Sequence, residues 1–139
     1  MPSSTADLVK VALAHSAAEG AGDMAGTMGT LEANPVYDFY PMGRRMTGLD
    51  QVRRYYEHFF AEVQPRIVGY EMIAEWIGDA GVNQEYTVRY RFDDGSVKSF
   101  RILGILTFGN AKLSGERLYA NEEFFRILIG PVWSETEQI

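Results

Sequence analysis

The hydrophobic pattern of the chain changes at Pro65, and this change limits the possible folds more than any other feature. Before Pro65, apolar residues recur every three or four positions, which predicts helices over about 5–19 and 50–63. A helical turn at 24–28 and a short strand at 36–40 are expected between them. After Pro65 the apolar residues alternate, which predicts strands at about 67–77, 86–92, 99–108 and 112–121, followed by a helical segment at 122–129.

Helices followed by a run of strands predict an α+β fold, in which the helices pack on one face of a curved antiparallel sheet. The chain has 139 residues, a length that is typical of one domain. Because no linker, repeat or low-complexity segment interrupts it, we predict a single domain over 1–139. The polar tail from Trp133 to Ile139 is expected to be frayed.

Charge and residue types narrow the possible partners and reactions. The chain carries 19 acidic and 13 basic residues, a net charge of −6, which argues against nucleic acids and anionic membranes as partners. It has no Cys and only two His, so we expect neither a metal nor another cofactor. The first residues lack the pattern of a signal peptide, and no apolar stretch is long enough to span a bilayer. A cytoplasmic location is therefore the expectation.

Four polar residues fall at positions that the periodicity assigns to the apolar interior. His15 lies on the apolar stripe of the first predicted helix, and Asp38 and Tyr40 share one face of the first predicted strand. Glu116 shares a face with Leu118 on the last strand. A buried carboxylate is unstable unless it is paired, hydrogen bonded or protonated. We therefore select Glu116, Tyr40, Asp38 and His15 as candidate catalytic residues.

Three of these four residues also have a structural explanation. A histidine on an apolar stripe is more often a hydrogen-bonded core residue than a catalytic one. Asp38 can accept a hydrogen bond from the loop after Gly43. A β-bulge at Gly115 would turn Glu116 to the outer face of the sheet.

Aromatic residues make up 13% of the chain, and the pattern places many of them on the inner faces of helices and strands. Core packing is their default role, and ligand contact is the second possibility. The candidate ligand-binding residues among them are Tyr55, Tyr56, Phe59, Trp76, Tyr86 and Tyr90. The outer face of the predicted sheet alternates Glu and Arg, which fits either a solvated surface or contact with another subunit.

Short motifs are distributed along nearly the whole chain. They are the segment 34–45 (NPVYDFYPMGRR), the pair Tyr55-Tyr56, the segment 114–117 (SGER) and the segment 124–130. Together they resemble the SnoaL-like polyketide cyclase family of the nuclear transport factor 2-like superfamily. The resemblance implies a cone-shaped, cystatin-like α+β barrel, in which a curved sheet and long helices enclose one deep apolar pocket. It also implies a homodimer formed through the outer sheet face.

The resemblance allows known site patterns of the superfamily to be compared with this chain. In the ketosteroid isomerase pattern, the base aspartate falls near Tyr40, the oxyanion-hole aspartate near Gly104 and the helix tyrosine near His15. Two carboxylates are missing from this pattern, so we do not expect that reaction. The acid/base aspartate of SnoaL-type cyclases corresponds in position to Asn121 of this chain. We include Asn121 among the candidate ligand-binding residues.

Two functions from different classes follow from these residues. The first is a cofactor-independent lyase or isomerase that acts on a small, largely apolar, carbonyl-bearing or polyketide-like substrate. In it, Glu116 transfers the proton, and Tyr40, with Asp38 and His15 beside it, stabilises the oxyanion. The second is a non-catalytic module that binds a small apolar or aromatic molecule. A structural dimer whose pocket is filled by side chains is a third possibility.

Overall fold

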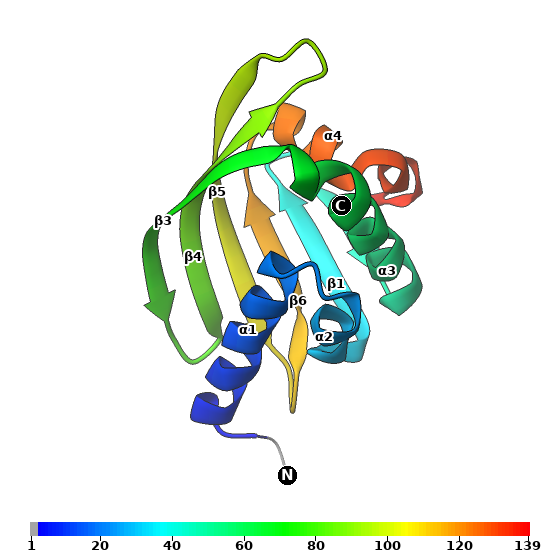
Figure 1. Ribbon diagram of the computed structural model, residues 1–139. Helices are drawn as coiled ribbons and strands as arrows, with labels where there is room; N and C mark the ends of the chain where they lie inside the picture. The colour runs from blue at the N-terminus through cyan, green and yellow to red at the C-terminus, as the bar shows by residue number, and fades with distance from the viewer. Residues whose placement is uncertain (1–2) are drawn as a thin grey trace.

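The computed structural model describes residues 3–139 and consists of a long curved sheet with helices packed against it (Figure 1). Residues 1 and 2, which the predicted domain includes, lie outside the described residues. The N-terminal half contains α1 (Thr5–Gly20), α2 (Met24–Gly29), β1 (Leu31–Tyr40), β2 (Arg44–Thr47) and α3 (Leu49–His58), which continues through a π-helical turn (Phe59–Val63) and a 3-10 turn (Gln64–Arg66). The C-terminal half contains β3 (Ile67–Ile77), β4 (Gly81–Arg91), β5 (Val97–Phe108), β6 (Leu113–Tyr119), α4 (Glu122–Ile129), a 3-10 helix (Gly130–Glu135) and β7 (Glu137–Gln138).

Three helices begin at residues whose side chains accept a backbone hydrogen bond. Ser4 accepts from the amide of Asp7 at the start of α1. Asp23 accepts from the amide of Gly26 in α2, and Asn121 accepts from the amide of Phe124 in α4. These caps satisfy amides that would otherwise lack a partner inside the helix, so the local sequence determines where each helix starts.

The seven strands found within residues 3–139 form one open, curved sheet in the order β3-β4-β5-β6-β1-β2-β7. The segment from β3 to β6 is the predicted antiparallel meander, and the α+β prediction is confirmed. The prediction that all strands are antiparallel was wrong, because β1 pairs with β6 in parallel. β1 and β6 run in the same direction because the chain passes through α3 and three long strands between them.

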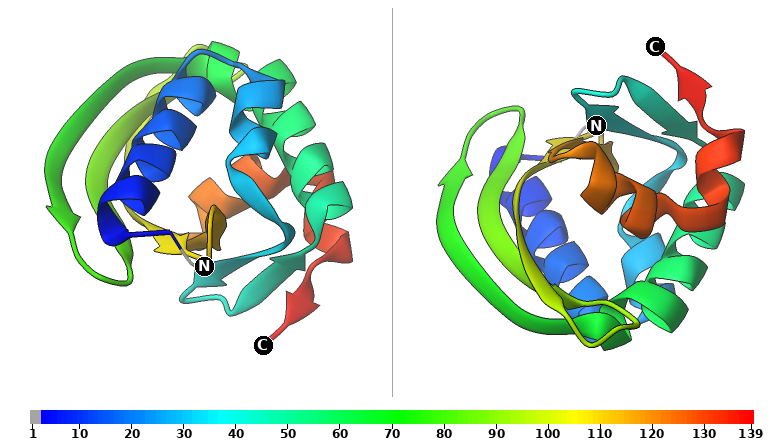
Figure 2. Two further views of the ribbon diagram at one scale, coloured as in Figure 1. Left: turned by 90° about the horizontal axis from the view of Figure 1, so that it is seen from below. Right: turned by 90° about the horizontal axis from the view of Figure 1, so that it is seen from above.

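The helices lie on the concave side of the sheet. Two views at right angles to the first show the bent sheet partly surrounding α1, with α3 opposite β3 and β4 (Figure 2). Large side chains from both layers are completely buried between them, namely Tyr37, Phe39, Tyr56, Ile102 and Phe125. Burial of these side chains is the main force that holds the helices in the curve. Within residues 3–139, no helix combines the length and the apolar character needed to cross a membrane.

The edge strand β3 departs from the predicted pattern. The sequence predicts Tyr70 and Trp76 on one inner face, but the pairing of β3 with β4 is interrupted between Met72 and Ala74. This bulge leaves Ile73 without a partner and reverses the faces of the residues after it. Trp76 therefore lies on the outer face, where it is 52% exposed.

The loop expected after Gly43 and the tail expected to be frayed are ordered and contact each other. Residues 44–47 form β2, which pairs with β7 from the C-terminal tail. The Arg44 guanidinium donates hydrogen bonds to the carbonyls of Trp133 and Thr136 and to the hydroxyl of Thr136. These contacts join segments that are far apart in the sequence, so periodicity alone does not indicate them.

Candidate functional site

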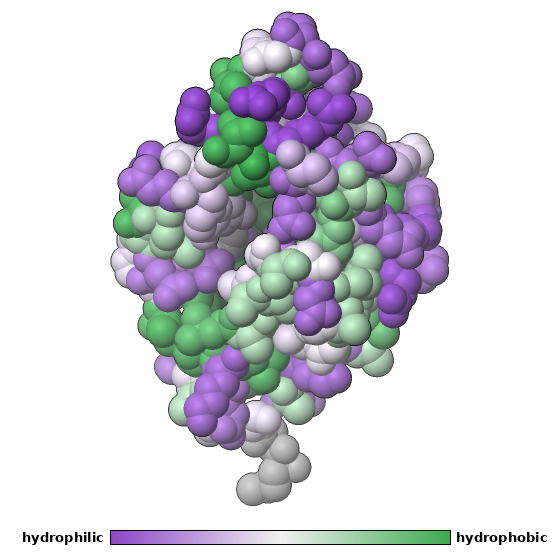
Figure 3. Space-filling model, viewed as in Figure 1, coloured by the Kyte–Doolittle hydropathy of each residue, from purple (hydrophilic) through white to green (hydrophobic). Residues whose placement is uncertain are grey.

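A cavity of about 430 Å³ lies between the concave face of the sheet and helices α1, α3 and α4. Its hollow is visible at the middle of the face shown in the space-filling view (Figure 3). Its apolar wall is formed by Phe59, Ile67, Val88, Leu106, Leu118, Phe124 and Leu128. Its polar wall is formed by His15, Ser16, Glu19, Tyr55, Gln64, Tyr70, Gln84, Tyr86 and Glu116. The volume and mixed lining are typical of a site for a small organic molecule.

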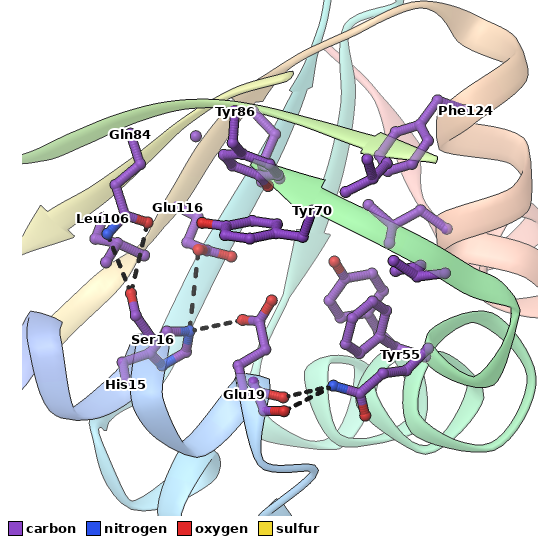
Figure 4. Close-up of a pocket in the computed structure, with 18 residues that line it drawn as sticks. His15, Ser16, Glu19, Tyr55, Tyr70, Gln84, Tyr86, Leu106, Glu116 and Phe124 are labelled. Atoms are coloured by element: carbon purple, nitrogen blue, oxygen red, sulfur yellow. Dashed lines mark hydrogen bonds and ion pairs between the residues drawn. The ribbon is translucent and has the colours of Figure 1, made fainter. Parts of the chain in front are cut away.

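Two carboxylates face one imidazole at the α1 side of this cavity (Figure 4). The Nε2 atom of His15 lies 3.2 Å from Oε2 of Glu19 and 3.9 Å from Oε1 of Glu116. His15 and Glu19 are four positions apart on α1, so both side chains project from the same face of the helix. Glu116 reaches the group from β6. His15, Glu19 and Glu116 are called the acid cluster below.

The hydrogen bond on the other side of the His15 ring determines its tautomer. The Thr30 hydroxyl donates its only proton to the carbonyl of Thr27, at 2.7 Å. Its oxygen must therefore accept a hydrogen bond from Nδ1 of His15, which is also 2.7 Å away. Nδ1 carries a proton, and Nε2 is the atom that can exchange a proton with the carboxyl groups of Glu19 and Glu116.

The environment of the acid cluster favours bound protons. Burial raises the pKa of Glu116 to about 8, the charge of Glu19 adds to this effect, and His15 opposes it. Burial lowers the pKa of His15, but the hydrogen bond to Glu19 and the charges of both carboxylates together raise it above its ordinary value. The three groups titrate together, so a proton in the cluster belongs to all of them.

A buried pair of phenols supports the acid cluster from behind. The hydroxyls of Tyr37 and Tyr56 lie 2.7 Å apart, and Tyr56 also approaches Nε2 of His15 at 3.2 Å and Oε2 of Glu19 at 3.3 Å. Burial raises the pKa of both phenols well above the ordinary value, so both remain protonated. Since each phenol has one proton, these contacts compete with one another and connect four side chains in a single network.

The acid cluster is also the set of residues that could hold a cation. One ligand atom from each of its three residues lies within 4.8 Å of the others. The Tyr56 hydroxyl, however, already lies at hydrogen-bond distance from Nε2 of His15, the lone pair that a metal would need.

Five of the predicted site residues line the cavity, and one lies directly behind its wall. The five are His15, Tyr55, Phe59, Tyr86 and Glu116. Glu116 faces inward despite the irregular backbone at Gly115, and only 8% of it is exposed. Tyr56 is buried behind the wall in the phenol network. Glu19 was missed, although its spacing of four residues from His15 was a usable signal.

The sequence predicts that Asp38 and Tyr40 act together with Glu116, but the structure does not place them beside it. Tyr37 and Phe39 of β1 are completely buried on the inner face, so by alternation Asp38 and Tyr40 point to the outer face, where Asp38 is also buried. Asp38 accepts two hydrogen bonds from the guanidinium of Arg45, at 2.7 and 2.9 Å. Tyr40 stacks on Tyr119 of β6. Neither residue lines the cavity.

Three candidate ligand-binding residues also lie outside the cavity lining. Trp76 is on the outer face of the sheet, beyond the bulge in β3. Tyr90 is buried against Phe92 near the end of β4. Asn121 caps α4, and this role explains its position after the last long strand without any contact to the pocket.

No protein-family model matches this chain. No curated protein matches it in sequence. Many solved structures share its fold. A nuclear transport factor 2-like protein of unknown function from Cytophaga hutchinsonii is 12% identical, covers 82% of this chain and 99% of its own length, and superimposes with a TM-score of 0.68.

Two other solved structures carry a proposed activity. A proposed polyketide cyclase from Xanthomonas campestris is 14% identical, with a TM-score of 0.68, and covers 92% of this chain and all of its own length. A proposed isomerase from Bacillus subtilis is 15% identical, with a TM-score of 0.69, and covers 92% of this chain and 96% of its own. At these identities the likeness shows the fold and does not extend to an activity. The chain has the fold of the nuclear transport factor 2-like proteins, as its sequence resemblance implies.

Proposed function

We propose that the cavity catalyses a cofactor-independent proton transfer on a small, largely apolar carbonyl compound, as a lyase or an isomerase. One observation carries the proposal: the buried carboxyl group of Glu116 forms part of the cavity wall within 3.9 Å of an imidazole, and its pKa is raised to about 8. A group with such a pKa holds its proton at neutral pH and also releases it readily. This is the property that acid/base catalysis requires.

His15 and Glu19 have distinct roles in this proposal. The charge of Glu19 keeps a proton on Glu116 or on His15, because two adjacent carboxylates are unfavourable in a buried site. The Nε2 atom of His15, 3.2 Å from Glu19, takes up or returns the proton that Glu116 exchanges with the substrate. The apolar wall holds the substrate and limits the access of water, which strengthens electrostatic interactions inside the cavity.

The proposal is tested by deuterium exchange, because this measurement does not require the natural substrate. Acetophenone, 2-tetralone and a cyclic β-diketone are incubated in D₂O with the protein, and loss of the α-proton signals is followed by NMR. We expect faster exchange than in buffer for at least one compound. Glu116→Gln should reduce the acceleration by about two orders of magnitude or more.

Asp38→Asn is the matched control, since it also removes a carboxylate but on the outer face. It should leave the exchange rate unchanged. Compounds that bind without any exchange would contradict the catalytic proposal and favour the second candidate, a module that binds a small apolar or aromatic molecule. The aromatic and aliphatic lining supports that alternative.

We also propose that two copies of the chain associate through the outer face of the sheet. Trp76 and Tyr119 are exposed there beside half-buried Leu103, a combination that is unusual for a surface in contact with water only. Light scattering coupled to gel filtration should give the mass of a dimer. Trp76→Glu should lower the measured mass to that of a monomer. A monomer mass for the parent protein would contradict the proposal.

A further inference from the structure

Two phenol groups of the cavity wall have no hydrogen-bond partner among residues 3–139. Tyr55, from α3, is only 3% exposed, and Tyr86, from β4, is partly buried. No hydrogen bond joins either hydroxyl to another group, whereas Tyr37 and Tyr56, in the same core, are bonded to each other. Among residues 3–139, no side-chain oxygen or nitrogen atom is both fully buried and without a partner, so these two hydroxyl oxygens reach the accessible surface of the cavity. A hydroxyl of this kind that faces a cavity is available to a bound molecule.

Both hydroxyls face the same space as the acid cluster. Tyr55, Tyr86 and Glu116 all line the one cavity. The backbone of β5 leaves room beside Tyr86, because a Cβ atom at Gly104 would lie 3.8 Å from the Tyr86 hydroxyl and no side chain is present there. Burial, with the charges of Glu19 and Glu116, raises the pKa of Tyr55 and of Tyr86 well above the ordinary value. Both phenols therefore keep their protons and act as donors.

We infer that Tyr55 and Tyr86 donate hydrogen bonds to one oxygen atom of the substrate, and that this oxygen is a carbonyl whose neighbouring C–H bond faces Glu116. The cavity then has an oxygen-binding side, formed by the two phenols, and a proton-transfer side, formed by the acid cluster. This arrangement replaces the predicted role of Tyr40, which points away from the cavity. The inference rests on the proposed function for its chemical step, but not for its binding step.

The chemical step balances with the groups that are present. Glu116 first passes its own proton to Nε2 of His15, and the resulting carboxylate takes the proton from the carbon beside the carbonyl. The electron pair of the broken C–H bond forms a C=C bond. The carbonyl π pair moves to oxygen, and the two phenol donors stabilise the resulting oxyanion. Return of the same proton to a carbon atom restores both the carbonyl and the carboxylate. Donors that are already in position need no rearrangement during this step.

Binding of a matched pair of probes tests the inference. 2-Naphthol carries one oxygen on an aromatic frame, and naphthalene is the same frame without it. Dissociation constants of both are measured by calorimetry with the full chain and with Tyr55→Phe, Tyr86→Phe and the double variant. We expect each single variant to weaken 2-naphthol binding by roughly threefold to tenfold, as for loss of one hydrogen bond. Naphthalene binding should remain unchanged in all of them.

Two control variants remove a phenol hydroxyl elsewhere. Tyr90→Phe lies on the same strand as Tyr86 but outside the cavity lining, and Tyr40→Phe lies on the outer face of the sheet. Both should leave the affinities of both probes unchanged. Equal losses for 2-naphthol and naphthalene, or no loss in the Tyr55 and Tyr86 variants, would overturn the inference.

Failure of this inference is distinguishable from failure of the proposed function. Weaker 2-naphthol binding in the Tyr55 and Tyr86 variants, without any deuterium exchange in the parent protein, would retain the oxygen-binding side and reject the catalytic proposal. Exchange that depends on Glu116 but is unaffected by both tyrosine variants would retain the catalytic proposal and reject this inference.

Discussion

The Nε2 atom of His15 lies 3.9 Å from Oε1 of Glu116, although the two residues come from the first helix and the last long strand. The distance is short enough for each group to change the protonation of the other. Folding therefore brings together two titratable groups that are independent in the unfolded chain. The energetic consequences of this contact are measurable without knowledge of the ligand.

Replacement of Glu116 by Gln should change how stability depends on pH. The pKa of Glu116 is about 8 in the folded state, against an ordinary value of 4.5, so between these values the folded protein holds a proton that the unfolded chain has released. The contribution of Glu116 to the free energy of unfolding is fully present below pH 4.5 and is lost as the pH rises through 8. Between these values the free energy of unfolding falls by at most about 1.4 kcal/mol per pH unit. The raised pKa of His15 acts in the same direction.

The measurement is urea denaturation at pH 5 and at pH 8.5. The parent protein should lose stability between the two, and Glu116→Gln should lose less, so that the variant gains relative to the parent at the higher pH. Parallel losses in both proteins would show that Glu116 ionises normally. Asp38→Asn is again the control, because it leaves the acid cluster intact.

Removal of the Tyr56 hydroxyl should destabilise the protein more than removal of the Tyr37 hydroxyl. The Tyr56 hydroxyl lies within 3.3 Å of the Tyr37 phenol, the His15 imidazole and the Glu19 carboxylate. The Tyr37 hydroxyl lies 2.7 Å from that of Tyr56 and also hydrogen bonds Glu116, which lowers the pKa of that carboxyl group. We expect Tyr56→Phe to lower the free energy of unfolding by about 1 to 3 kcal/mol. A double-mutant cycle with Tyr37→Phe should give a non-zero coupling energy, and simple additivity would contradict the network.

The ion pair of Asp38 should affect stability and not binding. Asp38 accepts both hydrogen bonds of the Arg45 fork, but Arg45 is 37% exposed, so solvent screening reduces the value of the pair. We expect Asp38→Asn to lower the free energy of unfolding by about 1 to 2 kcal/mol. The affinity for 2-naphthol should be unchanged. Loss of affinity without loss of stability would instead support the catalytic role predicted from the sequence.

The close approach of β1 and β6 should make Gly115 intolerant of any side chain. Its φ is +143°, and a Cβ atom there would lie only 1.8 Å from the carbonyl oxygen of Val36. Gly115→Ala should therefore lower stability by about 3 kcal/mol or more, or prevent folding. Gly29→Ala is the control, because no atom lies within 4 Å of a Cβ at that position. Its effect on the urea midpoint should be small.

Local sequence signals were sufficient for most of the secondary structure. The helical spacing of α1 and α4, the cap at Ser4, and the alternation of β4 and β5 are properties of neighbouring residues, so they can be recognised in the chain alone. The inward direction of Glu116 followed from its spacing to Leu118. The long β3 strand was also predicted with its correct ends.

The errors concern features that depend on contacts between distant segments. The bulge in β3 is determined by its pairing with β4, and one extra residue reverses every side chain after it, so Trp76 was assigned to the wrong face. Asp38 was placed inside because a polar residue among apolar ones can be buried by a partner, here Arg45, as well as by a pocket. The unpartnered hydroxyls of Tyr55 and Tyr86 are recognisable only when all surrounding groups are known.

The two register shifts of β3 have a consequence for association between molecules. β3 is one edge of the sheet, and an edge strand offers free backbone groups to any extended chain with matching spacing. Shifts near its start and in its middle interrupt that spacing, so a second strand cannot continue the ladder along its whole length. The same irregularity that exposes Trp76 thus protects the protein from fibrous aggregation along this edge.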